Sequence, residues 1–158
     1  MNDFDFSHTL EPGAHLETPP VYCGKTEGLG EMSRQMNRFC LELLLPSRFR
    51  AETLPLLYNY WEATEFNVNV ADQTRLAEIA AGIGVELFVM DDGWFGARNN
   101  DRAGLGDWFV NPVKFPGGLD ELIGNVNALG MDFGLWVEPE MVNPDSDLYR
   151  AHPDWTYH

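Results

Sequence analysis

Apolar positions along this chain change their spacing several times, and each change separates a helical segment from an extended or irregular one. Residues 1–30 are rich in Pro and Gly and predict irregular structure with isolated short strands. From Glu31 to Leu45, apolar residues recur at the spacing of one helix face, and Pro46 stops the run. The first third of the chain therefore predicts one amphipathic helix after an irregular start.

Strand-like and helix-like segments alternate after this helix. Residues 54–61 form a short apolar and aromatic run that predicts a strand. Residues 71–81 place apolar side chains on one face of a helix, with Gly82 as its cap. Residues 84–90 are almost continuously apolar, as expected for a parallel strand that is covered on both faces.

The same order recurs over residues 119–129 and 131–137, which predict a helix and a strand joined by a capping glycine, Gly130. A carboxylate, Glu138, follows this glycine at the same distance at which Asp92 follows the glycine of the earlier strand. The repeated unit is a helix, a glycine, a buried strand and a carboxylate at the carboxyl end of that strand.

Successive strand and helix units predict an α/β fold with a parallel sheet and right-handed crossovers. An open doubly wound sheet and a closed (β/α)8 TIM barrel both satisfy this order. The Trp61-Glu-Ala-Thr stretch disfavours the open sheet, because no glycine-rich phosphate loop follows the first strand. In a barrel, side chains at the carboxyl ends of the strands converge on one mouth. Those ends carry Trp61, Asp91, Asp92, Trp136 and Glu138.

Asp91 and Asp92 follow the second predicted strand and stand directly before Gly93 and Trp94. Neighbouring side chains on a strand point to opposite faces, but a turn at Gly93 lets both carboxylates face the mouth. Asp-Asp-Gly is also an ordinary turn sequence. Carboxylates beside indoles are typical of sugar sites, where an aromatic face covers the C–H side of the ring. The tryptophans near predicted strand ends favour the sugar site; they are Trp61, Trp94, Trp108 and Trp136.

These two carboxylates are poorly placed to be the catalytic pair of a glycosidase. Such a pair flanks the scissile bond, with the groups about 5 Å apart in retaining enzymes and further apart in inverting ones. Sequence neighbours at one strand end lie on the same side of the sugar. We therefore expect Asp91 and Asp92 to bind substrate hydroxyls.

Charge excludes some partners. The 158 residues include 25 acidic and 10 basic side chains, a net charge of -15 that repels nucleic acid and anionic membranes. The first residues are acidic where a secretory signal has a basic start, and no apolar run is long enough to span a membrane. We expect a cytoplasmic protein. Cys23 and Cys40 are expected to be reduced and buried, rather than joined in a disulfide or bound to a metal.

Five ordered motifs resemble glycoside hydrolase family 36, the microbial α-galactosidases. They are NYWEAT (59–64), LFVMDDGWFG (87–96), LGDW (105–108), GLWVEPEMV (134–142) and DLYRAHPDW (147–155). The resemblance implies a fragment of a (β/α)8 TIM barrel that supplies about the first three strand and helix units over residues 51–158. Residues 1–50 resemble, more weakly, the end of that family's amino-terminal β-domain and its connecting helix.

The resemblance also implies a function. It implies retaining hydrolysis of terminal α-D-galactosyl residues from oligosaccharides of the melibiose and raffinose type, with no metal or organic cofactor. Asp91 and Asp92 match the acidic pair that binds the galactose 4- and 6-hydroxyls, and Trp61 and Trp136 match aromatic residues that line the pocket. The family's nucleophile and acid/base lie beyond His158, so no catalytic residue is expected within this chain and the fragment alone should be inactive.

The sequence is compatible with several alternatives. Glu138 and Glu140 are expected to be structural, held by an ion pair or a strand-end hydrogen bond. Galactosyl transfer or hydrolysis of another α-sugar fits the acidic pair as well, and a non-catalytic sugar-binding module fits the carboxylates and indoles. The expected partner is an α-galactoside, and the resemblance leaves open assembly of the full-length protein into a homo-oligomer.

Overall fold

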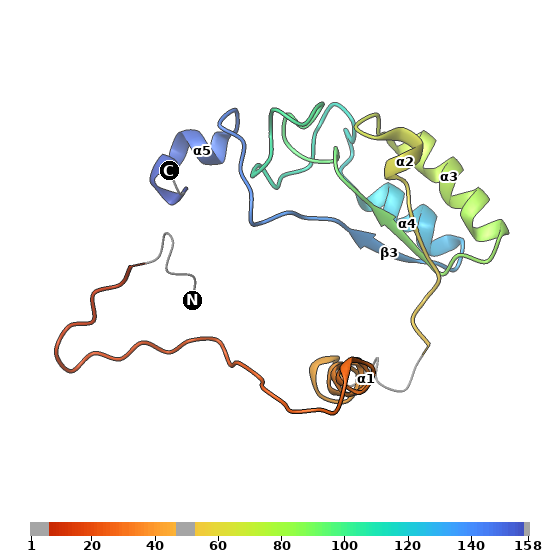
Figure 1. The fold of residues 1–158 in the computed structure, drawn as a ribbon. Helices are drawn as coiled ribbons and strands as arrows, with labels where there is room; N and C mark the ends of the chain where they lie inside the picture. The colour runs from red at the N-terminus through yellow and green to blue at the C-terminus, as the bar shows by residue number, and fades with distance from the viewer. Residues whose placement is uncertain (1–6, 47–52, 157–158) are drawn as a thin grey trace. The chain divides into compact units, whose positions relative to one another are not determined.

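The computed structural model describes residues 7–46 and 53–156, and it divides into two units, Met1–Glu52 and Thr53–His158 (Figure 1). The predicted domain boundary at residues 50 and 51 lies outside the described residues. Within the described ranges, no helix is long and apolar enough to cross a membrane.

The first unit contains the predicted amphipathic helix. Helix α1 spans Leu29–Phe39 and continues into one π-helical turn, η1, over Cys40–Leu44. The prediction of isolated strands before it is wrong for the described residues 7–28, which form neither helix nor strand. An extended segment needs a neighbouring strand to complete its hydrogen bonds, and the described part of this unit supplies none.

The two cysteines lie in this unit and are unpaired, as expected. Their predicted burial is wrong: Cys23 is exposed and Cys40 is only partly buried. Helix α1 buries none of its own residues, so the described part of this unit has no core that could enclose a thiol.

The second unit is built on a three-stranded parallel sheet in the order β1-β2-β3. Strand β1 is Leu57–Asn59, β2 is Leu87–Met90 and β3 is Asp132–Leu135. Helix α3, Val70–Gly82, connects β1 to β2, and helix α4, Asp120–Ala128, connects β2 to β3. The predicted order of strand, helix and strand is confirmed, and this small parallel sheet with its helices is consistent with part of a TIM barrel.

Two predicted boundaries shift. The first predicted strand ran to residue 61, but β1 stops at Asn59 and Trp61 begins a short helix, α2, Trp61–Thr64. The predicted cap Gly82 belongs to α3 itself, and the left-handed glycine is Gly84, with φ of 90°. Gly130, with φ of 83°, follows α4 as predicted.

Strand β2 is buried on one face rather than on both. Phe88 and Met90 are fully buried, whereas Leu87 and Val89 on the other face remain partly exposed. Helices α3 and α4 lie side by side along the sheet (Figure 1), and Asn125 Nδ2 of α4 donates to Thr74 Oγ1 of α3 at 3.0 Å. Among the described residues, nothing buries the second face, which in a closed barrel would point toward the interior.

Two long segments gather beyond the carboxyl ends of the strands (Figure 1). One runs from β2 to α4, and the other follows β3 into helix α5, Asp147–Ala151, and the 3-10 turn η3, Pro153–Trp155. The backbone joins these segments, because Gly104 N donates to Asp145 O at 2.8 Å and Asn143 N donates to Leu105 O at 3.0 Å. They carry most of the residues that the sequence singled out.

Candidate functional site

The site begins at the last residue of β1. Asn59 donates through Nδ2 to Asp91 Oδ2 across the strand ends, and its Oδ1 accepts from Trp61 N at 2.8 Å. One amide side chain therefore fixes both the first carboxylate of the acidic pair and the start of α2.

Asp91 is the more accessible member of the pair. Its side chain is partly exposed, and its Oδ1 accepts a hydrogen bond from Asp92 N at 2.7 Å. A carboxylate offers about four lone-pair sites, and Asn59 and the Asp92 amide use two of them. Asp91 therefore retains acceptor capacity for ligand hydroxyls.

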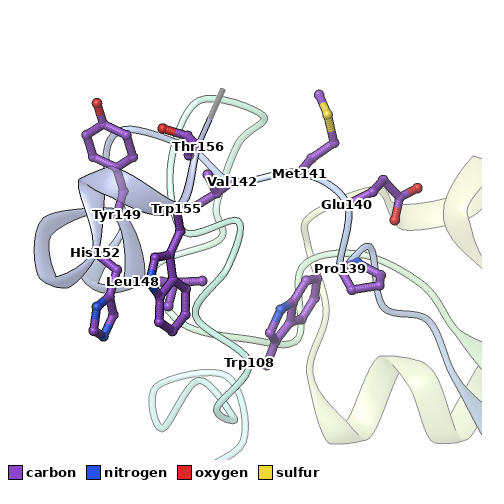
Figure 2. A pocket seen from close by; sticks show the side chains of 10 residues that line it. All are labelled: Trp108, Pro139, Glu140, Met141, Val142, Leu148, Tyr149, His152, Trp155 and Thr156. Carbon is purple, nitrogen blue, oxygen red and sulfur yellow. The ribbon is translucent and has the colours of Figure 1, made fainter. Parts of the chain in front are cut away.

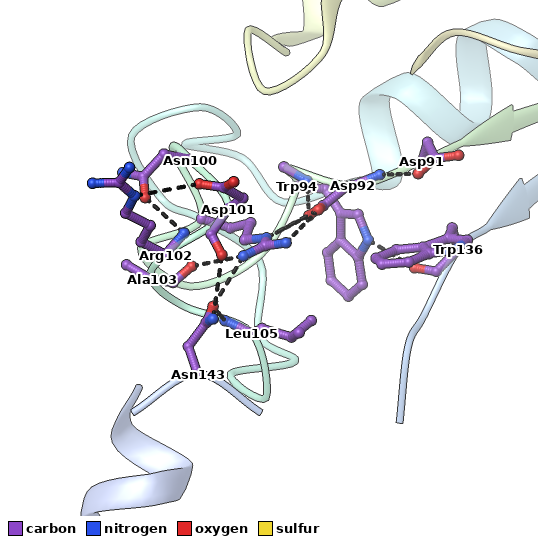
Figure 3. A network of polar contacts seen from close by, with 12 residues as sticks. Asp91, Asp92, Trp94, Asn100, Asp101, Arg102, Ala103, Leu105, Trp136 and Asn143 are labelled. Carbon is purple, nitrogen blue, oxygen red and sulfur yellow. Dashed lines mark hydrogen bonds and ion pairs between the residues drawn. The ribbon is translucent and has the colours of Figure 1, made fainter. Parts of the chain in front are cut away.

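Asp92 is nearly enclosed, with only 6% of its surface exposed. Its Oδ1 accepts from Gly93 N at 2.6 Å, and the guanidinium of Arg98 binds both carboxylate oxygens at 2.8–3.0 Å (Figure 3). The predicted turn at Gly93 is confirmed by its φ of 94°, and an added Cβ there would lie 3.1 Å from Phe66 Cα. Only glycine fits this bend without strain.

Tyr60 makes a hydrogen bond to the backbone of the acidic pair. This residue is fully buried, and its hydroxyl donates to the backbone carbonyl of Asp92. Burial, assisted by the negative charges of Asp91 and Asp92, raises the pKa of Tyr60 well above its ordinary value. The phenol therefore stays protonated and remains a donor.

Lys114 joins the segment between β2 and α4 to the loop before α3. Its Nζ donates to the carbonyl oxygens of Phe66, Gly93 and Arg98 at 2.8, 2.7 and 2.8 Å. Burial lowers the pKa of Lys114, and the nearby charge of Asp92 acts in the opposite direction. This ammonium joins the loop before α3 to the segment that follows the acidic pair.

Three of the chain's five tryptophans lie close together beside the pair. Trp94 Nε1 donates to Trp136 O at 3.1 Å, and Trp108 has its ring centroid 6.3 Å from each of these two indoles. Trp94 is buried, while Trp108 and Trp136 are partly exposed. Trp61 is separate from this cluster and packs edge-on against Phe66 at 5.0 Å.

Glu138 and Glu140 do not behave as expected. In the part of the chain that the structure describes, neither carboxylate makes an ion pair or a hydrogen bond, so the prediction of a structural contact is wrong there. Both glutamates follow the end of β3 in an irregular segment where the side chains are at least partly exposed.

A cavity of about 410 Å³ lies outside the acidic pair. Figure 2 shows Trp108 and Pro139 on one side of it and Leu148 and Trp155 on the other, while the Glu140 carboxylate points away. Its lining mixes these apolar side chains with polar ones, among them Tyr149 and His152, and it includes neither Asp91 nor Asp92. In the described residues, no group of three or more His, Cys, Asp or Glu side chains could hold a metal ion.

Four residues of this site were missed by sequence reasoning: Asn59, Arg98, Lys114 and Asn143. Their common feature is a polar group that meets a partner from another segment, which spacing along the chain does not reveal. A weak signal exists for Arg98, because a cation six positions after an acidic pair is unusual in so acidic a chain. Asn59 belongs to a matched motif but has no feature of its own that marks it.

Comparison with known proteins places these residues in a family. The family model described as Melibiase matches residues 15–158. Over 159 residues, all of this chain is 49% identical to α-galactosidase AgaA of Geobacillus stearothermophilus, of which it covers 22%. An α-galactosidase of Escherichia coli is 51% identical over 148 residues, which are 92% of this chain and 21% of that protein.

Solved structures agree with the sequence relatives. A variant of the same Geobacillus enzyme, in complex with stachyose, is 51% identical with a TM-score of 0.76, over 84% of this chain and 18% of that one. The α-galactosidase of Lactobacillus brevis gives a TM-score of 0.76 at 48% identity, over 85% of this chain and 18% of that one. This chain spans about a fifth of the length of the curated relatives it matches. The resemblance to glycoside hydrolase family 36 α-galactosidases is confirmed, and the chain belongs to the Melibiase family.

Proposed function

We propose that the complete protein, meaning the gene product that contains this chain, is an α-galactosidase. It hydrolyses terminal α-D-galactosyl residues from oligosaccharides of the melibiose and raffinose type, with retention of configuration and without a metal or organic cofactor. The observation that carries the proposal is Asp91, a partly exposed carboxylate held between two strand ends with acceptor sites to spare. A carboxylate in that state binds sugar hydroxyls strongly.

In this proposal the sugar site combines carboxylates that bind hydroxyls with indoles that pack against the ring. Asp91 and Asp92 bind the 4- and 6-hydroxyls of galactose, and Trp61 and Trp136 cover its apolar surface. The partly exposed indoles at the ends of β1 and β3 support this division, since an aromatic face packs on the C–H side of a sugar ring.

The catalytic fold is a (β/α)8 barrel. Residues 51–158 supply its first three units, and residues 1–50 supply the end of an amino-terminal β-domain with a connecting helix. The three parallel strands support the barrel, and so do the exposed apolar side chains Leu57 and Leu135 on its two outer strands. The remaining strands and helices of a barrel would cover these side chains.

This chain supplies recognition rather than chemistry. A retaining glycosidase needs two carboxyl groups about 5 Å apart on opposite sides of the scissile bond. Asp91 and Asp92 are adjacent, share one strand end and are joined by a backbone hydrogen bond. In line with the family resemblance, we place the nucleophile and the acid/base outside residues 1–158 and expect the chain alone to hydrolyse nothing. We further propose a cytoplasmic location for the complete protein.

Kinetics of the complete protein test the proposal. Asp91→Asn should lower kcat/KM on p-nitrophenyl α-D-galactopyranoside at least tenfold, because an amide replaces a charge-assisted acceptor that is worth about 1.5–3 kcal/mol. Asp132→Asn is the matched control, since Asp132 is exposed at the opposite end of the sheet. NMR of the first product should show α-galactose.

Three results would contradict this reading. Unchanged kinetics in folded Asp91→Asn would remove Asp91 from the site. Galactoside binding without turnover would favour a sugar-binding module. Transfer of galactose to an added sugar in preference to water would favour a galactosyltransferase.

A further inference from the structure

We propose that Arg98 is a positioning residue for sugar recognition, which fixes the carboxylate of Asp92 so that it accepts one defined hydroxyl. The inference rests on the proposed function, because it concerns how the same acidic pair meets its substrate. Arg98 lies outside the motifs that carry the family resemblance, and its contact with Asp92 comes from the structure.

The hydrogen bonds of Asp92 leave room for one further donor. Gly93 N, Arg98 Nε and Arg98 Nη2 all donate to this carboxylate, at 2.6–3.0 Å. Arg98 Nε carries one hydrogen, which lies within reach of both oxygens, so three N–H groups share about four lone-pair sites and leave acceptor capacity for a single further donor. Asp91, with two donors, keeps two. The structure thus divides the pair into one carboxylate that accepts two hydroxyl hydrogen bonds and one that accepts a single bond.

The guanidinium is itself held from the side away from Asp92. Arg98 Nη1 donates to Asn143 Oδ1 at 2.9 Å and to Ala103 O at 3.2 Å (Figure 3). Asn143 in turn donates to Asp101 O at 3.2 Å, and its Oδ1 also accepts from Leu105 N at 3.1 Å. The orientation of the Asp92 carboxylate is therefore set by the long loop after β2 and by the segment after β3.

Burial makes this arrangement rigid. The side chains of Arg98 and Asp92 are only 6% and 8% exposed, and the Phe66 ring lies 5.3 Å from the guanidinium. A buried ion pair of this kind adds little net stability compared with a well-packed apolar pair, because both charges lose their hydration. The ion pair instead fixes the direction in which the carboxylate of Asp92 can accept a further hydrogen bond, beside the carboxylate of Asp91.

Charge balance gives a second reason for a cation at this position. Two carboxylates on adjacent residues repel each other, and the repulsion grows where one of them is removed from water. The guanidinium neutralises the enclosed member of the pair and leaves the negative charge on Asp91, which faces solvent. Lys cannot replace it fully, because a single ammonium lacks the planar fork that binds both oxygens.

Substrate analogues with one hydroxyl missing test this role in the complete protein. We compare p-nitrophenyl α-D-galactopyranoside with its 4-deoxy and 6-deoxy analogues, using Arg98→Met, Arg98→Lys, Asp92→Asn and the double variant of Arg98→Met with Asp92→Asn. Arg102→Met is the matched control, because Arg102 lies in the same loop but its side chain is 92% exposed.

Asp92→Asn should lower kcat/KM on the galactoside at least tenfold and have less than a threefold effect on one deoxy analogue, which identifies the hydroxyl that Asp92 binds. Arg98→Met should have a similarly small effect on kcat/KM for the same analogue. The double variant should lower kcat/KM no further than the more strongly affected single variant does. Arg98→Lys should show the same pattern with a smaller loss. The double variant also removes the unpaired buried charge, so it serves if Arg98→Met does not fold.

Two results would overturn the proposal. One is Arg98→Lys or the double variant losing activity equally on all three substrates, which indicates a general structural role. The other is a folded Arg98→Met that hydrolyses the galactoside within twofold of the unmodified protein. If the proposed function is wrong, the unmodified protein itself releases no nitrophenol. In that case, calorimetric binding of galactose and its deoxy analogues by the same variants decides the role of Arg98.

Discussion

Lys114 offers the sharpest test of how the loops around the acidic pair are held. Its Nζ is within hydrogen-bond distance of the carbonyl oxygens of Phe66, Gly93 and Arg98. Phe66 O has a second donor, Val68 N at 3.1 Å, whereas Lys114 is the one donor found for the other two carbonyls among the described residues. Lys114→Met keeps the length of the side chain but leaves those two carbonyls without a partner.

The expected loss of stability follows from the number of carbonyls left without a donor. A buried carbonyl without a donor costs about 1–3 kcal/mol, so two of them cost about 2–6 kcal/mol. Water reaches part of this site because Lys114 is only partly buried, and removing the ammonium also removes its own desolvation cost. We therefore expect a local destabilisation of about 2–4 kcal/mol, in the lower half of that range.

Hydrogen exchange measures this loss where it occurs. In Lys114→Met, the amides of Gly93 and Asn111, which are bonded to Asp92 Oδ1 and Trp94 O, should exchange about 30-fold to 1000-fold faster. The amide of Val126, in the interior of α4, should be nearly unchanged. Lys25→Met is the control, because Lys25 is exposed in the other unit. Exchange of Gly93 and Asn111 within twofold of the unmodified protein would refute the reasoning.

Two further predictions concern residues around the site. Galactose should change the tryptophan fluorescence of the complete protein, and Trp136→Phe should reduce that change; an identical signal and affinity in the Trp61 and Trp136 double variant would make these indoles structural only. For Tyr60, burial raises the pKa of the folded phenol above the unfolded value of about 10, so its contribution to stability is present below pH 10 and is lost as the pH rises further. Tyr60→Phe should cost about 1–2 kcal/mol at pH 7 and should make the alkaline loss of stability shallower, as measured by urea midpoints between pH 8 and pH 11. An unchanged alkaline slope would contradict the role given to Tyr60.

The sequence by itself determined the order of elements and the end of the second strand. A run of apolar residues that ends in carboxylates and a glycine has a local preference for a strand followed by a turn. The structure has β2 and the turn at Gly93 at these positions. Helix α4 and its glycine cap were predictable for the same reason. Where a side chain's environment depends only on periodicity and nearby turns, the pattern along the chain is sufficient.

Tertiary structure alone decided which face of β2 is covered and what the carboxylates touch. Burial of Phe88 and Met90, but not of Leu87 and Val89, depends on where α3 and α4 pack. The partner of Asp91 comes from a different strand, 32 residues away, and the residue that anchors Arg98 lies 45 residues from it. Hydrogen bonds between distant segments form only when the fold brings their ends together, so no spacing rule along the chain can predict them.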